Sequence, residues 1–135
     1  MKKNKIEYSE YLMPPEAEIF LDIVKKEFSE SLNVEGKHLS KWLKHHGESE
    51  GKWIRAKLGL ATGSLLGLSS DTYIKWAVVC ELIHSASLLH DDICDKDSLR
   101  RGRITVWKEF GIPAAICTGD YLIAESFRKI TESNR

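Results

Sequence analysis

The stretch that decides the fold is ELIHSASLLHDDICD, residues 81–95. It closes a segment from about Thr72 to Asp95 that contains no proline or glycine and is apolar along most of its length. A Ser-Ser-Asp run at residues 69–71 offers side-chain oxygens that suit a helix N-terminus. The pattern predicts one long, largely buried helix that ends in a cluster of aspartates.

The remainder of the chain is also predicted to be helical, because no part of it alternates with period two for long enough to form a strand. Helices are expected over residues 16–32 (after Pro14 and Pro15), over 52–66 with Gly67 as the cap, and from Pro113 toward Ile130; single helical turns are expected over 39–43 and 106–110. HHGESE (residues 45–50) is predicted as a solvent-exposed turn and KDSLRRGRI (residues 96–104) as a polar loop. The predicted fold class is all-α.

Length and composition limit the classes of protein. With 135 residues and 42% hydrophobic residues, the chain is predicted to form a single helical domain over residues 1–135. Twenty basic residues balance twenty acidic ones, which argues against a nucleic-acid or anionic membrane partner. No signal peptide and no apolar run long enough for a transmembrane segment are evident, so a cytoplasmic location is expected. Cys80, Cys94 and Cys117 lack CxxC spacing and are expected to be free thiols.

The aspartates predict a cation site. Asp91 and Asp95 lie one helical turn apart with Asp92 alongside, at the end of an apolar helix. Like charges at that spacing repel, so a positive group should compensate them. Magnesium suits the pair because it binds through one or two carboxylates, several waters and substrate phosphates.

Three arginines follow directly. Arg100, Arg101 and Arg103 supply planar donors that can hold phosphate oxygens in a bidentate manner. The competing interpretation is that the whole charged stretch is a solvated, internally salt-bridged helix end. Composition alone leaves both interpretations open.

Four motifs resemble the trans-type polyprenyl diphosphate synthases, the family that includes farnesyl, geranylgeranyl and octaprenyl diphosphate synthases. They are GKWIR (51–55), ELIHSASLLHDDICD with the first DDxxD motif (81–95), LRRGR (99–103) and FGIPAAICTGDYL (110–122). The resemblance extends over about residues 51–127 and implies the N-terminal half of the isoprenoid synthase helical bundle.

The resemblance also implies roles for individual residues. Asp91 and Asp95 would ligate Mg²⁺ with Asp92 supporting them, and Arg100 would hold the allylic diphosphate. The diphosphate of isopentenyl diphosphate would be bound by Lys52, Arg55, His84 and Arg101. The implied reaction ionises the allylic prenyl diphosphate, joins it to the double bond of isopentenyl diphosphate and releases a proton. The small residues Ala86 and Ser87, one turn before Asp91, resemble those of medium- or long-chain synthases.

The sequence departs from the family pattern in three ways. Trp53 replaces an arginine and Ala56 replaces a proline, and the second aspartate motif is absent. The chain is therefore interpreted as a fragment, as one subunit whose partner synthase subunit supplies the second motif, or as a homo-oligomer that opposes two first motifs.

Two other functions remain open. A non-catalytic regulatory or structural subunit of a prenyl diphosphate synthase would retain the same helices. An HD-type metal phosphohydrolase would use the His90-Asp91 doublet together with His38, His45, His46 and Asp120. Terpene cyclases also use DDxxD, but the GKxxR and LRRGR motifs favour an enzyme with two diphosphate substrates.

Overall fold

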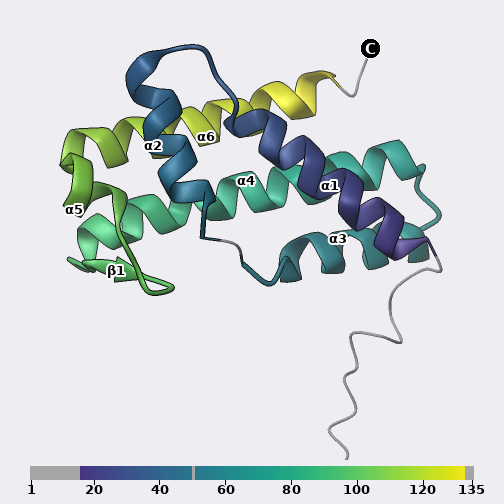
Figure 1. Cartoon of the computed structure of the whole chain (residues 1–135). Helices are drawn as coiled ribbons and strands as arrows, with labels where there is room; N and C mark the ends of the chain where they lie inside the picture. Colours follow the sequence, from purple (N-terminus) through teal and green to yellow (C-terminus); the bar gives the residue numbers. More distant parts are fainter. Residues whose placement is uncertain (1–15, 50, 133–135) are drawn as a thin grey trace, which may run out of the picture.

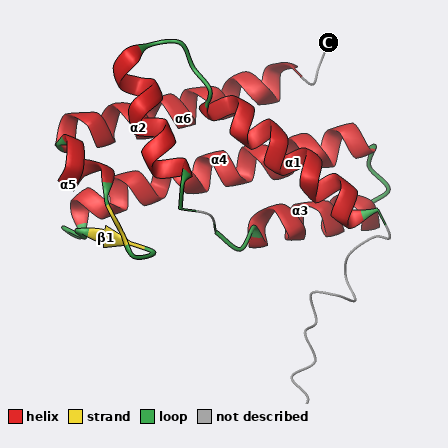
Figure 2. Ribbon diagram, viewed as in Figure 1, coloured by secondary structure: helices red, strands yellow, loops and turns green. Residues whose placement is uncertain are grey.

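Helices make up nearly all the regular structure over residues 16–49 and 51–132, the part of the chain that the computed structural model describes. In order, the elements are α1 (Ala17–Leu32), α2 (Lys37–Gly47), α3 (Ile54–Leu65), α4 (Ser70–Cys94), β1 (Leu99–Arg100), β2 (Arg103–Ile104), α5 (Val106–Phe110) and α6 (Ile112–Glu132) (Figure 2). The predicted all-α class is confirmed. Pro14 and Pro15 lie outside the described residues.

The long helix α4 forms the centre of the structure. It packs most extensively on α6 and α3, and α1 crosses it (Figure 1). Its buried apolar side chains include Val78, Leu82 and Leu89, each at most 1% exposed. The prediction of a long, largely buried helix is therefore confirmed.

Helices α3 and α4 end in the same backbone motif. At the end of α3, the Leu68 amide donates to the Gly63 carbonyl and the Gly67 amide to the Ser64 carbonyl, with Gly67 at φ 68°. This is a Schellman motif, so the predicted glycine cap is confirmed. At the end of α4, Lys96 occupies the equivalent left-handed position at φ 54°.

Helix α2 differs from the prediction. It contains 11 residues rather than a single turn, and it includes His45 and His46. Lys44 lies in its last turn, where positive charge is favoured by the carbonyl end of the helix dipole. The prediction that the helix stops before the histidines was wrong, because contacts with the Ile104 carbonyl and with Ser85 hold His45 and His46 in the helix.

The expected loop at residues 96–104 contains a hairpin instead. Strands β1 and β2 pair antiparallel with Arg100 opposite Arg103. The two intervening residues, Arg101 and Gly102, have φ 50° and 76°, as a type I′ turn requires. Two-residue strands are too short to produce a detectable alternation, which is why the sequence pattern missed them.

The described cysteines and helices add two observations. Cys80, Cys94 and Cys117 are free and exposed. Among the helices that the structure describes, none combines the length and the apolar character that crossing a bilayer requires.

Candidate functional site

The four residues expected to bind isopentenyl diphosphate lie around one cavity. It has a volume of about 470 Å³ and is formed by the start of α3, the middle of α4 and the arginine hairpin. Its lining includes Lys52, Arg55, His84 and Arg101. Residues separated by up to 49 positions in the sequence are thus brought to one concave surface of predominantly positive charge.

His84 occupies the α4 wall of this cavity. Burial lowers the pKa of its imidazole, and the nearby charges of Arg55 and Arg101 lower the pKa further, although Glu81 opposes them. A neutral imidazole at neutral pH offers one donor and one acceptor, whereas the arginines supply fixed positive charge.

Arg101 reaches the cavity from a constrained backbone. Its φ of 50° is unusual for a residue with a side chain, and the Arg101 Nη1 donates a hydrogen bond to the Ser49 carbonyl at 2.8 Å. A Cβ atom on Gly51 would lie 2.8 Å from the Arg101 Nη2, so a side chain here would displace the end of the guanidinium from its present position. The glycine of the GKWIR motif therefore makes room for the arginine of the LRRGR motif.

A second cavity of about 320 Å³ continues from the first toward α1. The two share Gly51, Trp53, Glu81, His84 and Arg101. Trp53 stands where the family pattern has arginine, and its ring packs edge-on against Phe28 with the centroids 5.1 Å apart. The Lys25 Nζ lies 5.8 Å from the same ring. The substitution thus replaces a cation with an aromatic wall that is fixed by α1.

Glu81 is a residue of this region that the sequence analysis did not single out. It is 8% exposed, and its Oε1 accepts a hydrogen bond from the Ala56 amide at 2.8 Å. The family pattern has proline at position 56, and proline has no amide hydrogen to donate. A sequence signal existed, because a glutamate within an apolar helix requires a buried partner.

The segment predicted as an exposed turn instead anchors the hairpin. The His45 Nε2 donates to the Ile104 carbonyl at 2.7 Å, and the Arg103 Nη2 pairs with the Glu48 Oε2 at 2.5 Å. The prediction holds for Glu48, which is exposed, but it was wrong for the two histidines, which lie in α2 and are only partly exposed.

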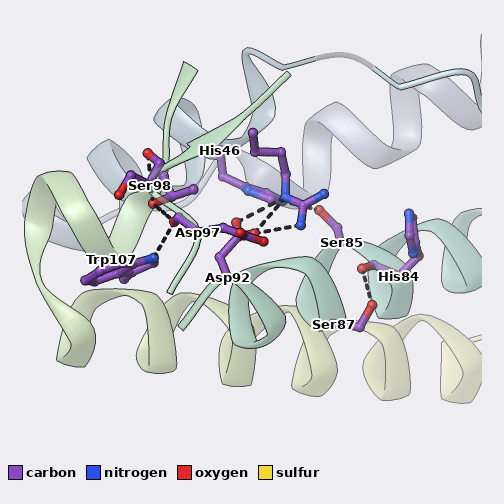
Figure 3. Close-up of polar contacts among 10 residues, drawn as sticks. His46, His84, Ser85, Ser87, Asp92, Asp97, Ser98 and Trp107 are labelled. Atoms are coloured by element: carbon purple, nitrogen blue, oxygen red, sulfur yellow. Dashed lines mark hydrogen bonds and ion pairs between the residues drawn. The ribbon is translucent and has the colours of Figure 1, made fainter. Parts of the chain in front are cut away.

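His46 connects the same segment to α4. Its Nε2 lies 2.6 Å from the Ser85 Oγ (Figure 3). Burial lowers the pKa of His46 to about 4, assisted by the positive charges of Arg100 and Arg101. His46 is therefore neutral at pH 7 and serves as a structural contact.

The three aspartates separate into two environments. Asp91 and Asp95 are exposed, whereas Asp92 is 3% exposed and points toward the hairpin (Figure 3). The Arg100 Nε lies 3.0 Å and 3.1 Å from the two Asp92 carboxylate oxygens, and the Arg100 Nη2 lies 2.6 Å from Oδ1. These hydrogen bonds raise the pKa of Arg100. Asp92 and Arg100, both expected at the substrate, are bound to each other here.

Two carboxylates in this region are suitable ligands for magnesium. Asp91 and Asp95 offer carboxylate oxygens one turn apart, the type and number of protein ligands that Mg²⁺ uses when substrate phosphates complete its shell. Within residues 16–49 and 51–132, no three His, Cys, Asp or Glu side chains gather closely enough to hold a metal by themselves. A metal ion held by Asp91 and Asp95 would therefore complete its shell with further oxygens, such as those of water or of a phosphate.

The histidines of the phosphohydrolase alternative do not converge. The His90 Nε2 lies 3.4 Å from the Asp120 Oδ1 and 3.4 Å from the Ile116 carbonyl. His45 and His46 are engaged by the hairpin and by Ser85. The geometry gives no support to an HD-type centre.

Comparisons with known proteins agree with the fold and the motifs. Residues 36–135 match the family model for polyprenyl synthetase. The chain is 40% identical over 91 residues to a geranylgeranyl pyrophosphate synthase of Geoglobus acetivorans, covering 67% of this chain and 28% of that protein. It is 35% identical over 115 residues to heptaprenyl diphosphate synthase component 2 of Bacillus subtilis, covering 84% and 33%.

A solved structure shows the same arrangement of helices. The polyprenyl synthase from Caulobacter crescentus, complexed with calcium and isoprenyl diphosphate, superimposes with a TM-score of 0.83 at 29% identity over 88% of this chain and 36% of that one. This chain spans about a quarter to a third of the length of the curated relatives that it matches. From the match over residues 36–135 and the shared fold, the chain belongs to the polyprenyl synthetase family.

Proposed function

We propose that this chain carries the diphosphate-binding half of a trans-prenyltransferase that condenses isopentenyl diphosphate with an allylic prenyl diphosphate. The observation that supports this most directly is the cavity that Lys52, Arg55, His84 and Arg101 line together. Fixed positive charge from two arginines and a lysine suits a diphosphate, because guanidinium groups bind phosphate oxygens in a bidentate manner.

The allylic substrate is assigned to the other end of the same helix face. Asp91 and Asp95 would hold Mg²⁺ against its diphosphate, and bound Mg²⁺ would supply Lewis-acid stabilisation of the departing diphosphate. Arg100 would add a charge-assisted donor, which requires it to share or leave its contact with Asp92. Asp92 then has a supporting role, because it holds the Arg100 guanidinium beside the exposed aspartates.

The proposed reaction has three steps, which together account for all atoms of both substrates. The allylic carbon–oxygen bond breaks and diphosphate leaves, the double bond of isopentenyl diphosphate attacks the resulting carbon, and a proton is lost to restore a double bond. The chain's contribution is to bind the two diphosphates along one face of α4, with the isopentenyl group held by α3 and the hairpin. Orientation of this kind supplies much of the rate enhancement in two-substrate reactions.

A medium- or long-chain product is part of the proposal. Ser87 is exposed on α4, one turn before Asp91, and its Oγ is turned back to donate to the His84 carbonyl at 2.7 Å. No bulky side chain therefore projects from that position to stop an isoprenoid tail. Ala86, which the sequence analysis placed beside Ser87, is 1% exposed and belongs to the core, so the tail would pass Ser87 only.

Association with a further chain is proposed for the complete enzyme. Large apolar side chains remain exposed along α4 and α6; they are Trp76, Ile83, Ile112, Ile116, Ile123 and Phe127. Surfaces of this kind mark interaction sites. The occupant would be a second copy or a partner synthase subunit that supplies the second aspartate motif.

A non-catalytic subunit is the second candidate function. One relative is named as a component of heptaprenyl diphosphate synthase, and this chain matches a third of its length. Such a subunit would retain the diphosphate cavity without turning over substrate alone.

Isothermal titration of the purified chain with isopentenyl diphosphate tests the proposal. Lys52→Met and Arg55→Met should each weaken binding about tenfold or more, because a hydrogen bond to a charged group contributes about 1.5–3 kcal/mol. Lys26→Met is the matched control, since Lys26 lies on α1 and pairs with exposed Glu30. Undetectable binding by the wild type, or equal losses in all three variants, would refute the cavity assignment.

An incorporation assay separates the two candidate functions. The chain is mixed with Mg²⁺, isopentenyl diphosphate and an allylic diphosphate, and its solution mass is measured on the same sample. Product formed by an oligomer supports a synthase, whereas binding without product supports a subunit that requires a partner. Asp91→Asn in an active sample should lower turnover about 10²–10³-fold.

A further inference from the structure

The GKWIR segment enters α3 without a local cap. Trp53, at the N-cap position, has φ 57° and no side-chain hydrogen bond to the first turn. Helix N-termini leave their first amides without intrahelical partners, and a local Ser, Thr, Asp or Asn ordinarily satisfies one of them. The position of Lys52 and Arg55, on either side of this residue, therefore depends on contacts from elsewhere in the fold.

Glu81 provides that contact. Its Oε1 accepts the amide hydrogen of Ala56, in the first turn of α3, from a position 25 residues later in the sequence. A carboxylate is favoured there because the helix dipole places partial positive charge at the N-terminus. A buried carboxylate with such a partner is also energetically acceptable, whereas one without a partner is not.

Glu81 links the α3 side of the diphosphate cavity, which carries Lys52 and Arg55, to the α4 side, which carries His84. Glu81 precedes His84 by three residues, so the two side chains share one face of α4. Both line the two adjoining cavities together with Trp53 and Arg101. The hydrogen bond from Ala56 to Glu81 thus fixes the spacing between the cations of α3 and the imidazole of α4.

We infer that Glu81 is a positioning residue of the diphosphate cavity: it acts as a tertiary N-cap of α3 that sets Lys52 and Arg55 at the distance from His84 which a diphosphate requires. The inference rests on the proposed function of the cavity. Glu81 acts through the acceptor oxygen that it presents to α3, and its negative charge is not itself a contact to the ligand. The length of the Glu81 side chain and its negative charge can be changed separately by substitution.

Two substitutions separate them. Glu81→Gln keeps an acceptor oxygen at the same reach and removes the charge, whereas Glu81→Asp keeps the charge and shortens the side chain by one methylene. Glu81→Gln should bind isopentenyl diphosphate within about twofold of the wild type. Glu81→Asp should bind about tenfold more weakly, which corresponds to about 1.4 kcal/mol.

Glu125→Asp and Glu125→Gln are the matched controls. Glu125 is 6% exposed and pairs with Arg128 on α6. Thermal unfolding should show that the aspartate variants at both sites lose stability, but only Glu81→Asp should lose affinity. If Glu81→Asp fails to fold, the comparison of Glu81→Gln with Glu81→Met, titrated in the same way, takes its place.

The outcomes are distinct. Wild-type affinity in Glu81→Asp, or a larger change in Glu81→Gln than in Glu81→Asp, would overturn the positioning role while leaving the proposed function intact. Equal affinity losses in Glu81→Asp and Glu125→Asp would reduce the role of Glu81 to general stability. Failure of the wild type to bind isopentenyl diphosphate would refute the proposed function and this inference with it.

Discussion

The buried ion pair between α4 and the hairpin gives a quantitative prediction for Arg100→Met. The Asp92 side chain is 4% exposed and the Arg100 side chain 25% exposed. Removing one partner of a fully buried pair costs about 3–5 kcal/mol, because a charge remains buried without compensation. Water can reach the site along the exposed quarter of Arg100, so we expect a loss of about 2–3 kcal/mol in the free energy of unfolding.

Urea unfolding followed by far-UV circular dichroism measures this loss. With a slope of about 1.5 kcal/mol per M, the unfolding midpoint should fall by about 1–2 M. Arg103→Met is the control from the same hairpin, because the Arg103 and Glu48 side chains are 41% and 58% exposed. Exposed pairs contribute about 1 kcal/mol or less, so the midpoint of that variant should move by well under 1 M.

The double variant Asp92→Leu/Arg100→Met completes the test. Replacing both charges with apolar groups removes the uncompensated carboxylate, and the midpoint should recover at least half of the loss. A midpoint of Arg100→Met that equals that of Arg103→Met would refute the assignment of Asp92 as a buried charge. So would a double variant that is less stable than Arg100→Met alone.

Three further predictions concern pH, packing and product length. The pKa of His46 falls from 6.5 to about 4 in the fold, so its contribution to stability is fully present above pH 6.5 and decreases, by up to about 3 kcal/mol, as the pH falls toward 4. The urea midpoint of His46→Gln should therefore decline less steeply with falling pH than that of the wild type. Equal declines would contradict the burial of a neutral His46. Gly63→Ala should destabilise the protein by about 1–3 kcal/mol, because the added Cβ would lie 2.1 Å from the Tyr73 Cβ. In Gly59→Ala, a control in the same helix, the added Cβ would lie 3.6 Å from Ala77, and the melting temperature should rise. The opposite order of melting temperatures would show that α3 packs differently. Ser87→Phe should shorten the prenyl product of an active assembly, which chromatography of the products would measure. Ala86→Phe should mainly overpack the core, because Ala86 is buried. An unchanged product length in Ser87→Phe would mean that the isoprenoid tail follows another path.

The periodicity of the sequence determined the helices, for reasons that are local to each segment. The absence of proline and glycine from residues 72–95 leaves a helix as the favoured state, and Gly67 supplies the left-handed residue that ends the preceding helix. The resemblance of the four motifs to the polyprenyl diphosphate synthases named Lys52, Arg55, His84 and Arg101, the residues that line the cavity of about 470 Å³. The local sequence was sufficient for the helices because their periodicity and caps depend on neighbouring residues.

The tertiary structure decided which partner each polar side chain has. Asp91 and Asp95 are four positions apart and share the exposed face of α4, whereas Asp92, rotated by about 100° from Asp91, is turned inward toward Arg100. Ala56 and Glu81 are 25 residues apart in the sequence, and the contacts of His45 and Glu48 with the hairpin span more than 50 residues. Periodicity states which face of a helix is apolar, but not which helix or hairpin lies opposite each polar group. The capping role of Glu81 and the anchoring of the arginine hairpin therefore became visible only once the helices were packed.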